Sequence, residues 1–543
     1  MTYKNSIVLL LIVATQFFSV VNAQNATSAN NTTSKFENWY NQDLSKDRKF
    51  GMSVDRAYGE LLKGKKSKTV IVAIIDSGID IFHEDLQGKI WTNEVEIPGN
   101  GIDDDHNGYI DDIHGWSYLG NSKGENIVYE NTELCRLYKK LDPIFKDIDP
   151  NQVKIKDTAE YHLYQKIKPK FLEELDKAKK EAEKITAFAA NYQFADSIMS
   201  KQLQKPEYTL EDLKTFNPDT VKSLKFSKEL LLFLYKQKSF NKSDFKEYLK
   251  QAFVKFYFQN NVSFNPRDII GDNPEDITDV KYGNNDVIGP DPEHGTHVAG
   301  IVGANRDNNI GVKGVAEDVK IMSLRVVPDG DERDKDIALA IRYATKMGAK
   351  VINMSFGKEL SPQKKFIDDA VKDAVAHDIL FVHAAGNDAK DIDTTANFPS
   401  NILLDNSDVK ANWITVGASS YKKGKNLPAS FSNYGKKEVD IFAPGVSIYN
   451  LKPGNLYKEN DGTSMASPMV AGLAALLRSY FPDLSAAKIK ECIMKSATVY
   501  THKVFLPEDG GSKRPKVRFN ELSVSGGVAN AYNAVKLAET MSK

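Results

Sequence analysis

The sequence predicts an α/β protein in which helices flank a doubly wound, mostly parallel sheet and an α-helical module is inserted. Two observations carry this prediction. Apolar, β-branched segments alternate with helical segments over much of the chain, and a long Lys- and Glu-rich stretch of helical character separates the first such segment from the others. Strand–helix alternation is typical of a parallel sheet whose crossover helices cover both faces.

The first strand candidate is TVIVAIIDSGID, which begins at Thr69 and ends in a glycine turn. Such an unbroken apolar run is typical of a strand buried on both faces. Further strand candidates are residues 319–327, 349–357, 378–387 and 413–419. Helical stretches between them are residues 334–346 and 363–376. Ligands bind at the carboxyl ends of such strands, where Asp76, Ser355 and Asn387 stand, so these are the first site candidates.

The N-terminus, residues 1–23, has the three parts of a secretory signal peptide. Lys4 supplies positive charge, Ile7–Val21 is apolar, and the sequence VNA offers small residues for cleavage after Ala23. A membrane anchor is the alternative, but the run is shorter than the roughly 20 apolar residues that span a bilayer. We therefore expect export to the periplasm or the extracellular space and no membrane span. Residues 24–36 are polar and of low complexity, which predicts a linker.

The remaining chain divides into three parts by composition. Residues 37–119 and 286–543 carry the strand–helix alternation, and residues 120–285 form the inserted helical module. The charge runs of the module are typical of solvated helix faces, and the apolar stripe Leu230–Tyr235 predicts packing against the main domain or within the module's own core. Alternatively, the module has a functional role as a lid that controls access to the site, because long insertions beside active sites are often functional.

Charge and cysteine content narrow the class of partner. Lys and Arg total 72 against 73 for Asp and Glu, a balance that gives no general attraction to nucleic acid or anionic lipid. The two cysteines, Cys135 and Cys492, could form one disulfide in an exported protein or remain buried free thiols. Protein or peptide substrates are the expected partners, and we expect a monomer without an organic cofactor.

Three short segments supply a carboxylate, an imidazole and a hydroxyl: DSGID at Asp76, HGTHVAG at His294 and GTSMASP around Ser464. A serine hydroxyl becomes a good nucleophile when an imidazole takes its proton, and the imidazole in turn needs a carboxylate. Taken singly, Asp76 could begin a turn, His294 could be a core histidine and Ser464 could cap a helix. Their joint occurrence favours catalysis.

The chain also contains a set of ordered segments: IIDSGIDIFHEDL, HGTHVAGIVGA, NNIGVKGVA, VINMSFG, HAAGN, ITVGAS, SFSNYG, IFAPG and GTSMASPMVAGLAALL. In this order they resemble the motifs of the subtilisin-like serine peptidases, also called subtilases. The similarity covers most of residues 69–85 and 292–477, with more in SVSGGVANAYNAVKLA near the end. So many ordered matches do not arise by chance, and they imply a subtilisin-like fold and a calcium-stabilised serine endopeptidase.

The resemblance assigns catalytic roles by motif. Asp76 orients the base, His294 is general acid and base, and Ser464 attacks the scissile carbonyl, an order known for one class of triads. Asn387 of HAAGN would stabilise the oxyanion with its side-chain amide, together with the Ser464 N–H. His297, the second histidine of HGTH, is implied to be structural.

The resemblance also implies where a peptide binds. The edge that pairs with extended peptide consists of Ser355, Phe356 and Gly357. The primary specificity pocket is implied to be lined by Ala384, Ala385 and Gly386, with Asn397 at its base. Small residues leave room there for a sizeable side chain, but they do not name a preferred one.

The sequence GNGIDDDHNGYIDD, residues 99–112, gathers hard oxygen ligands of the kind that Ca²⁺ favours. The predicted ligands are Asp103, Asp105, Asn107, Asp111 and Asp112 with their side chains, and Tyr109 with its carbonyl. An acidic surface loop is the alternative, although so many carboxylates repel one another unless a cation lies among them. The resemblance alone implies a second calcium loop, which would contain Asp85, Asn308, Ile310 and Val312. A tight Asn-Gly turn that binds no metal explains this loop sequence equally well.

Two features depart from the family pattern. Asp76 and His294 lie 218 positions apart, so the triad must close across the insertion. Only a few dozen residues separate the predicted signal from the first strand, too few for the folded prodomain that many subtilases have, so the route of maturation stays open. The leading hypothesis is an active endopeptidase. The alternatives are a catalytically silent member that binds a protein partner through its groove and helical module, and an acyltransferase.

Overall fold

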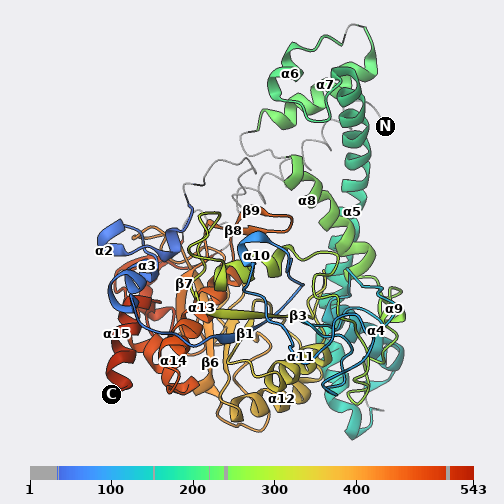
Figure 1. Cartoon of the computed structure of the whole chain (residues 1–543). Coiled ribbons are helices and arrows are strands. Elements are labelled where there is room, and N and C mark those ends of the chain that lie inside the picture. The colour runs from blue at the N-terminus through green and yellow to red at the C-terminus, as the bar shows by residue number, and fades with distance from the viewer. Residues whose placement is uncertain (1–33, 35, 151–152, 219, 238–241, 509–513) are drawn as a thin grey trace. The chain divides into compact units, whose positions relative to one another are not determined.

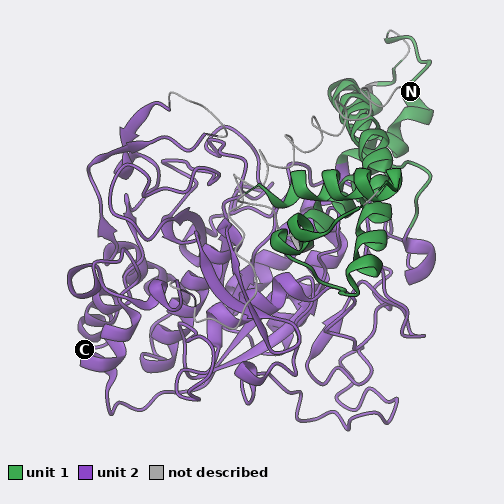
Figure 2. Cartoon of the chain, turned by 90° about the horizontal axis from the view of Figure 1, so that it is seen from above, with its two compact units in different colours: residues 1–28, 134–265 green, residues 29–133, 266–543 purple. Residues whose placement is uncertain are grey.

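The computed structural model describes residues 34, 36–150, 153–218, 220–237, 242–508 and 514–543 (Figure 1). The predicted signal peptide and nearly all of the predicted linker lie outside these residues. The chain forms two compact units, coloured in Figure 2. The larger unit comprises residues 29–133 and 266–543, and the helical unit includes residues 134–265. The helical unit therefore interrupts the larger one in sequence.

A nine-stranded sheet runs through the described part of the larger unit. In spatial order its strands are β10 (Thr498–Val499), β13 (Gly527–Val528), β7 (Ile441–Pro444), β6 (Trp413–Ser419), β5 (Leu380–Ala384), β4 (Val351–Met354), β1 (Val70–Asp76), β3 (Val319–Arg325) and β2 (Gly115–Ser117). All neighbouring pairs are parallel except β10 and β13. The predicted mostly parallel sheet is confirmed, and all five predicted strands belong to it.

Helices and two hairpins complete the larger unit. Its helices are α2 (Leu44–Asp47), α3 (Val54–Ala57), α9 (Arg267–Ile270), α10 (Glu293–Gly303), α11 (Asp334–Lys346), α12 (Lys364–Ala376), α13 (Thr463–Tyr480), α14 (Ala486–Lys495) and α15 (Ala531–Met541). The hairpins pair β8 (Ile448–Lys452) with β9 (Leu456–Asn460) and β11 (Lys503–Phe505) with β12 (Lys516–Arg518). The helices at 334–346 and 363–376 were thus placed by sequence to within one residue.

Alternate residues of β1 enter two different hydrophobic cores. Val72 and Ile74 belong to the core that contains side chains of α10, α13, α14 and α15. Ala73 and Ile75 belong to the core that contains side chains of α11 and α12. All four are fully buried. A strand covered on both faces has no position for a polar side chain, which is why the segment is an unbroken apolar run.

The helical unit has a hydrophobic core of its own. Its helices are α4 (Glu133–Phe145), α5 (Thr158–Leu203), α6 (Leu210–Thr215), α7 (Lys222–Tyr235) and α8 (Lys242–Val254). The apolar stripe on α7 contributes Leu230, Leu231 and Leu234 to this core, together with residues of α5 and α8. Although α5 is 46 residues long, no helix in the described ranges combines the length and apolar character needed to cross a bilayer.

The helical unit is narrower than the predicted module. Residues 120–133 and 266–285 group with the larger unit instead. Next to these flanks, the Ser117 N–H donates to the Asn284 carbonyl oxygen at 2.8 Å, and the Asn284 N–H donates back at 3.0 Å. The two ends of the insertion therefore meet at the edge of the sheet, beside β2. As limits of a separate domain, residues 120 and 285 stay a prediction.

Neither cysteine forms a disulfide. Cys135 lies on α4 and Cys492 on α14, and both are buried. Of the two alternatives that the sequence left open, the structure shows the buried thiols.

Candidate active site

An aspartate–histidine pair lies at the carboxyl end of β1. His294, in the first turn of α10, places Nδ1 2.7 Å from Asp76 Oδ1, which also accepts from the Ser77 N–H at 2.8 Å. The Asp76 side chain is 2% exposed and the His294 side chain 39% exposed. A carboxylate on Nδ1 selects the tautomer whose Nε2 can accept a proton. The pair is therefore oriented with its basic nitrogen available.

The charge of the pair favours protonation of His294. Burial of the imidazole opposes it, but the Asp76 carboxylate prevails and raises the pKa of His294 above its usual value of 6.5. A base whose pKa lies near the working pH transfers protons efficiently in both directions.

Ser464 is the second residue of α13. Pro468 lacks the N–H that would bond to the Ser464 carbonyl in a regular helix. That carbonyl accepts instead from Ser355 Oγ, at 2.9 Å, so a residue that follows β4 fixes the start of α13. The Ser464 hydroxyl and N–H lie at the positive end of an 18-residue helix, where developing negative charge is stabilised.

The Ser464 hydroxyl does not bond to His294 in this structure. It donates to the Ser355 carbonyl oxygen at 3.0 Å, and no hydrogen bond joins it to His294 within the described residues. The helices that carry the two residues pack against each other. Serine hydroxyls turn among staggered rotamers, and catalytic hydrogen bonds in substrate-free sites are often unformed. In this structure the Ser464 proton is therefore directed to Ser355, at the start of a helix that packs against the one that carries His294.

Asn387 presents an amide nitrogen beside Ser464. The backbone N–H and the hydroxyl of Thr463 donate to Asn387 Oδ1 at 2.8 and 2.9 Å. Because an N–H must face an acceptor, the amide oxygen is identified and Nδ2 points away from Thr463. Nδ2 has no hydrogen-bond partner in the described ranges, and it lies 3.7 Å from where a Cβ on Gly462 would be. The exposed Asn387 therefore offers a free donor next to Ser464.

The predicted peptide-binding walls face each other across Asn397. Gly357 is exposed, and neither its N–H nor its C=O has a partner among the described residues, as an edge that pairs with extended peptide requires. Asn397 Nδ2 donates to the carbonyl oxygens of Ala384 and Ala385, both at 3.1 Å. Its Oδ1 lies 2.4 Å from where a Cβ on Gly357 would be. The Asn397 amide thus spans the gap between the two walls.

Two residues that sequence reasoning did not single out support these walls. Asn433 Nδ2 donates to the Ala385 carbonyl oxygen at 2.8 Å. It also lies 2.4 Å from where a Cβ on residue 386 would be, and residue 386 has a φ of 101°, so only glycine fits there. His383 Nε2 lies 2.8 Å from the Phe356 carbonyl oxygen. Both belong to segments quoted for their similarity, SFSNYG and HAAGN, which was the signal that could have found them.

Two further histidines, His297 and His383, are buried and have no catalytic geometry. His297 Nε2 contacts the carbonyl oxygens of Ile448 and Lys458 at 3.1 and 3.2 Å. Burial lowers the pKa of His297 to about 4, and burial lowers the pKa of His383 to about 4 as well. Both are neutral at neutral pH and hold backbone segments together.

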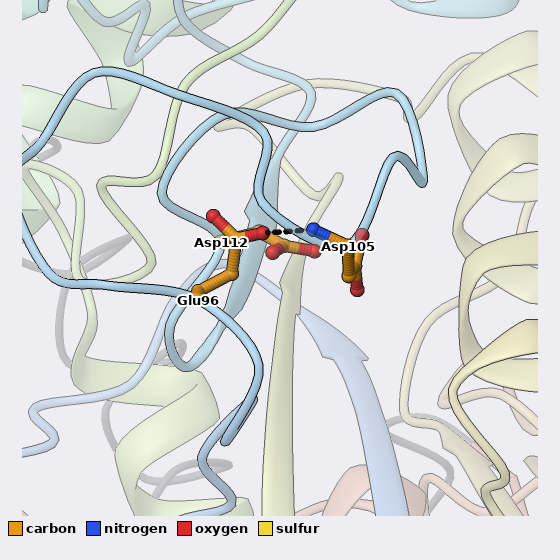
Figure 3. Close-up of side chains that lie close together, drawn as sticks. All are labelled: Glu96, Asp105 and Asp112. Atoms are coloured by element: carbon orange, nitrogen blue, oxygen red, sulfur yellow. Dashed lines mark hydrogen bonds between the residues drawn. The ribbon is translucent and has the colours of Figure 1, made fainter.

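Three carboxylates converge in the acidic loop: Glu96, Asp105 and Asp112 (Figure 3). One oxygen from each lies within 4.8 Å of the others. Burial raises the pKa of Glu96 and that of Asp112, because each carboxylate loses water and gains a like charge nearby. The hydrogen bonds that these carboxylates accept come from amide and hydroxyl groups of the described residues, not from lysine or arginine. Carboxylate oxygens that converge without a lysine or arginine among their hydrogen-bond donors form a ligand set that fits a hard cation such as Ca²⁺.

Glu96 was missed in the sequence because it precedes the 99–112 motif. Its carboxylate accepts from the Asp105 N–H at 3.0 Å and the Asp111 N–H at 3.1 Å, so it is folded into the loop from outside. Asp103 and Asp111 themselves accept only backbone N–H groups of the loop, at 2.7 to 3.0 Å, and shape its turns. Neither belongs to the converging cluster.

The last two predicted ligands of this loop also have other contacts. Asn107 turns its amide nitrogen, not its oxygen, toward Asp105 and Asp112, at 3.0 and 2.8 Å. The ring of Tyr109 packs against Trp116 at a centroid distance of 5.0 Å. The structure tests neither the Asn107 oxygen nor the Tyr109 carbonyl as a ligand, so both stay predictions.

Comparison with known proteins gives the family. A family model described as the subtilase family, Peptidase S8, matches residues 67–519. The chain belongs to the subtilase family. Subtilisin DY of Bacillus licheniformis is 40% identical over 207 residues, which are 38% of this chain and 70% of that protein. A thermophilic serine proteinase of Bacillus sp. strain AK1 is 42% identical over 188 residues, 34% of this chain and 42% of that protein.

A solved protease structure from Pseudoalteromonas arctica is 28% identical to this subtilase. It covers 45% of this chain and 70% of that one, with a TM-score of 0.36. Membership of the family makes this subtilase a serine peptidase by class and a hydrolase with a subtilisin-like fold. The roles of individual residues remain to be argued from the site.

In this subtilase the second predicted calcium loop is held by protein donors. Asp85 is fully buried and accepts from the Asn308 side-chain amide at 2.6 Å and the Val312 N–H at 3.1 Å. The Ile310 N–H donates to Asn308 Oδ1 at 3.2 Å. Burial raises the pKa of Asp85. These contacts explain the loop without a metal, and the ligand role of its four residues stays a prediction.

Proposed function

We propose that this subtilase is an exported serine endopeptidase that cleaves peptide bonds through Asp76, His294 and Ser464. The observation that supports it best is the buried aspartate 2.7 Å from a histidine, with Ser464 at the start of a helix packed against the one that carries that histidine. Export rests on residues 1–23, which have the pattern of a signal peptide.

The triad would act in two acyl-transfer steps. His294 Nε2 takes the proton of Ser464 Oγ as that oxygen attacks the scissile carbonyl carbon, and then gives the proton to the departing amine. Water next attacks the acyl-enzyme, with His294 again as base, and releases the acid. Asp76 stays ionised throughout and stabilises the imidazolium. For the first step the Ser464 hydroxyl must turn away from the Ser355 carbonyl toward Nε2.

The oxyanion would be held by two donors. Asn387 Nδ2 lies beside the start of α13, where the Ser464 N–H is, and within the described residues neither group donates to a protein acceptor that the oxyanion would have to displace. One such donor contributes about 3 kcal/mol to the transition state. The contacts from Thr463 support this role, because they hold the Asn387 amide in place before substrate binds.

A peptide substrate would pair with the unpartnered backbone of Gly357 and place one side chain between the two walls, against Asn397. The amide of Asn397 makes the base of that pocket polar. Gly386, which has no side chain, leaves the approach to Ser464 open.

Glu96, Asp105 and Asp112 would hold a calcium ion that stabilises the loop. When bound, the ion supplies positive charge to three converging carboxylates and takes no part in bond cleavage. Its expected effect is therefore on stability. Residues 37–119 and 286–543 would form one catalytic domain around the helical insertion.

Peptide hydrolysis by the purified protein tests this proposal. The parent should cleave an unfolded protein such as reduced casein at internal bonds, and Ser464→Ala should lower the rate by about 10⁴-fold or more. Equal cleavage by both proteins would show that a contaminant or another group is responsible, and no cleavage by the folded parent would contradict an active endopeptidase.

A further inference from the structure

A buried lysine directly follows the predicted substrate edge. The Lys358 side chain is 1% exposed. Its backbone forms an antiparallel bridge with Phe398: the Lys358 N–H donates at 3.1 Å and the Phe398 N–H donates back at 2.8 Å. Since Phe398 follows Asn397, this bridge joins the substrate edge to the loop that forms the base of the proposed pocket.

The Lys358 ammonium lies in a cage of acceptors. Nζ is 2.8 Å from Glu133 Oε2, 2.8 Å from Asp334 Oδ1 and 2.7 Å from the Glu332 carbonyl oxygen. The side chains of Glu133 and Asp334 are 7% and 1% exposed. A buried charge with buried counter-ions is fixed in place, because moving it away leaves unpaired charges in a medium of low polarity.

Both acidic residues of the cage have further hydrogen bonds. Asp334 begins α11, and its other oxygen accepts from Ser361 Oγ at 3.0 Å and the Gln363 N–H at 2.8 Å. Glu133 begins α4, and its N–H donates to Asp331 Oδ2 at 2.7 Å. Lys358 therefore joins the substrate edge to Asp334, at the start of α11, and to Glu133, and both are held by further hydrogen bonds.

We propose that Lys358 is a positioning residue for peptide binding. Through Glu133 and Asp334 it holds residues 355–357 at the spacing from Asn397 that an extended peptide requires. This proposal rests on the proposed function.

The alternative is that Lys358 only stabilises the fold, and Lys335 provides the matched control. Lys335 is equally buried, with its Nζ 3.0 Å from Asp272 Oδ2 and 2.9 Å from the Asn273 carbonyl oxygen, and it does not adjoin the edge. Lys358→Met and Lys335→Met each remove one buried ammonium from carboxylate partners. Both should lower the melting temperature, but only the first should disturb the edge.

Two substrates separate positioning from stability. A blocked tetrapeptide anilide uses the edge, whereas a small fluorophosphonate probe reacts with Ser464 without pairing to it. For Lys358→Met we expect kcat/KM on the tetrapeptide to fall about tenfold or more, mainly through KM, and the labelling rate to stay within about twofold of the parent. For Lys335→Met the two readouts should change by the same factor.

Lys358→Met would overturn the proposal if it lowered both readouts equally or left the tetrapeptide kcat/KM unchanged. If Lys358→Met does not fold, Glu133→Gln is the second variant, because it retains Asp334 as a counter-ion for Lys358. It should also lower the tetrapeptide kcat/KM more than the labelling rate, by a smaller factor. An unchanged ratio of these two readouts would contradict the proposal. A folded parent that neither cleaves the peptide nor takes the probe would overturn the proposed function first, before any variant is compared.

Discussion

At the residue scale, the proposed mechanism requires a neutral His294 to take the proton of Ser464. Because Asp76 raises the pKa of His294 above 6.5, the neutral fraction grows as the pH rises through that pKa. We expect kcat/KM on a peptide to rise about tenfold per pH unit on the acid side and to level off above the pKa. Rates measured from about pH 5 to about pH 9 check this. A flat profile, or a midpoint below 6.5, would contradict it.

Asn387 should act on the transition state and not on substrate binding. Asn387→Ala removes the only side-chain donor proposed for the oxyanion, so we expect kcat to fall by about 10²- to 10³-fold with KM little changed. Asn426→Ala, at an exposed asparagine outside the proposed site, is the control and should keep the parent's kinetics. A loss that appears in KM alone would assign Asn387 to ground-state binding.

The sequence predicted which residue types the site contains, but not all of their contacts. The motifs were sufficient to pair Asp76 with His294: Asp76 ends β1, His294 lies in the first turn of α10, and the two side chains meet at 2.7 Å. The rotamer of Ser464 depends on a carbonyl of Ser355, a contact between segments far apart in the chain. Glu96 was not predicted as a ligand, because it lies outside the 99–112 motif in sequence and joins the acidic cluster only in the folded structure.

At the element scale, the acidic loop should bind calcium and gain stability from it. Excess Ca²⁺ at about 100 times its Kd should stabilise the parent by about 2.7 kcal/mol relative to chelator, because it binds only the folded loop. Glu96→Gln removes one of the three converging carboxylates and should weaken the effect, while Glu94→Gln, at an exposed neighbour, should not. Melting scans with Ca²⁺ and with chelator measure it. A parent whose midpoint is the same in both argues against a calcium site here.

Long buried strands were predictable, and the shortest strands were not. The apolar run of β1 is continuous because two cores cover it, which gives a clear pattern. The strands β2, β10 and β13 have two or three residues each, too few to show any period. Helical composition likewise does not reveal that Ser117 and Asn284 pair at the lateral edge of the sheet, where the chain leaves the larger unit and returns to it.

At the scale of the whole molecule, two buried histidines should limit stability in acid. Burial lowers the folded-state pKa of His297 and of His383 to about 4, whereas an unfolded histidine titrates near 6.5. The unfolded chain thus binds protons first, so stability is full above about pH 6.5 and falls as the pH drops toward 4. Each group could remove up to about 3 kcal/mol over that range.

Urea unfolding at several pH values measures this loss. His383→Gln should make the free energy of unfolding less dependent on pH between about 6.5 and about 4, and His377→Gln, at an exposed histidine, should not. If the parent is equally stable at both ends of the range, the two histidines do not control its behaviour in acid.

The pairing of Asp76 with His294 across an insertion is a property of the whole larger unit. Asp76 and His294 are 218 positions apart in sequence. The candidate residues nevertheless gather at the carboxyl end of the parallel strands, because they stand on or next to β1, β4, α10 and α13. The pairing of Ser117 with Asn284 returns the chain to the sheet after the helical unit. The insertion therefore lengthens the chain between the two residues without separating them in space.

The central claim is that Ser464 is a nucleophile activated by His294. The most direct measurement is covalent labelling of the purified protein with a fluorophosphonate probe, followed by mass analysis of the labelled peptide. The parent should take up one probe on Ser464, and Ser464→Ala and His294→Ala should remain unlabelled. A parent that is folded but unlabelled, or labelling that persists equally in both variants, would contradict the claim.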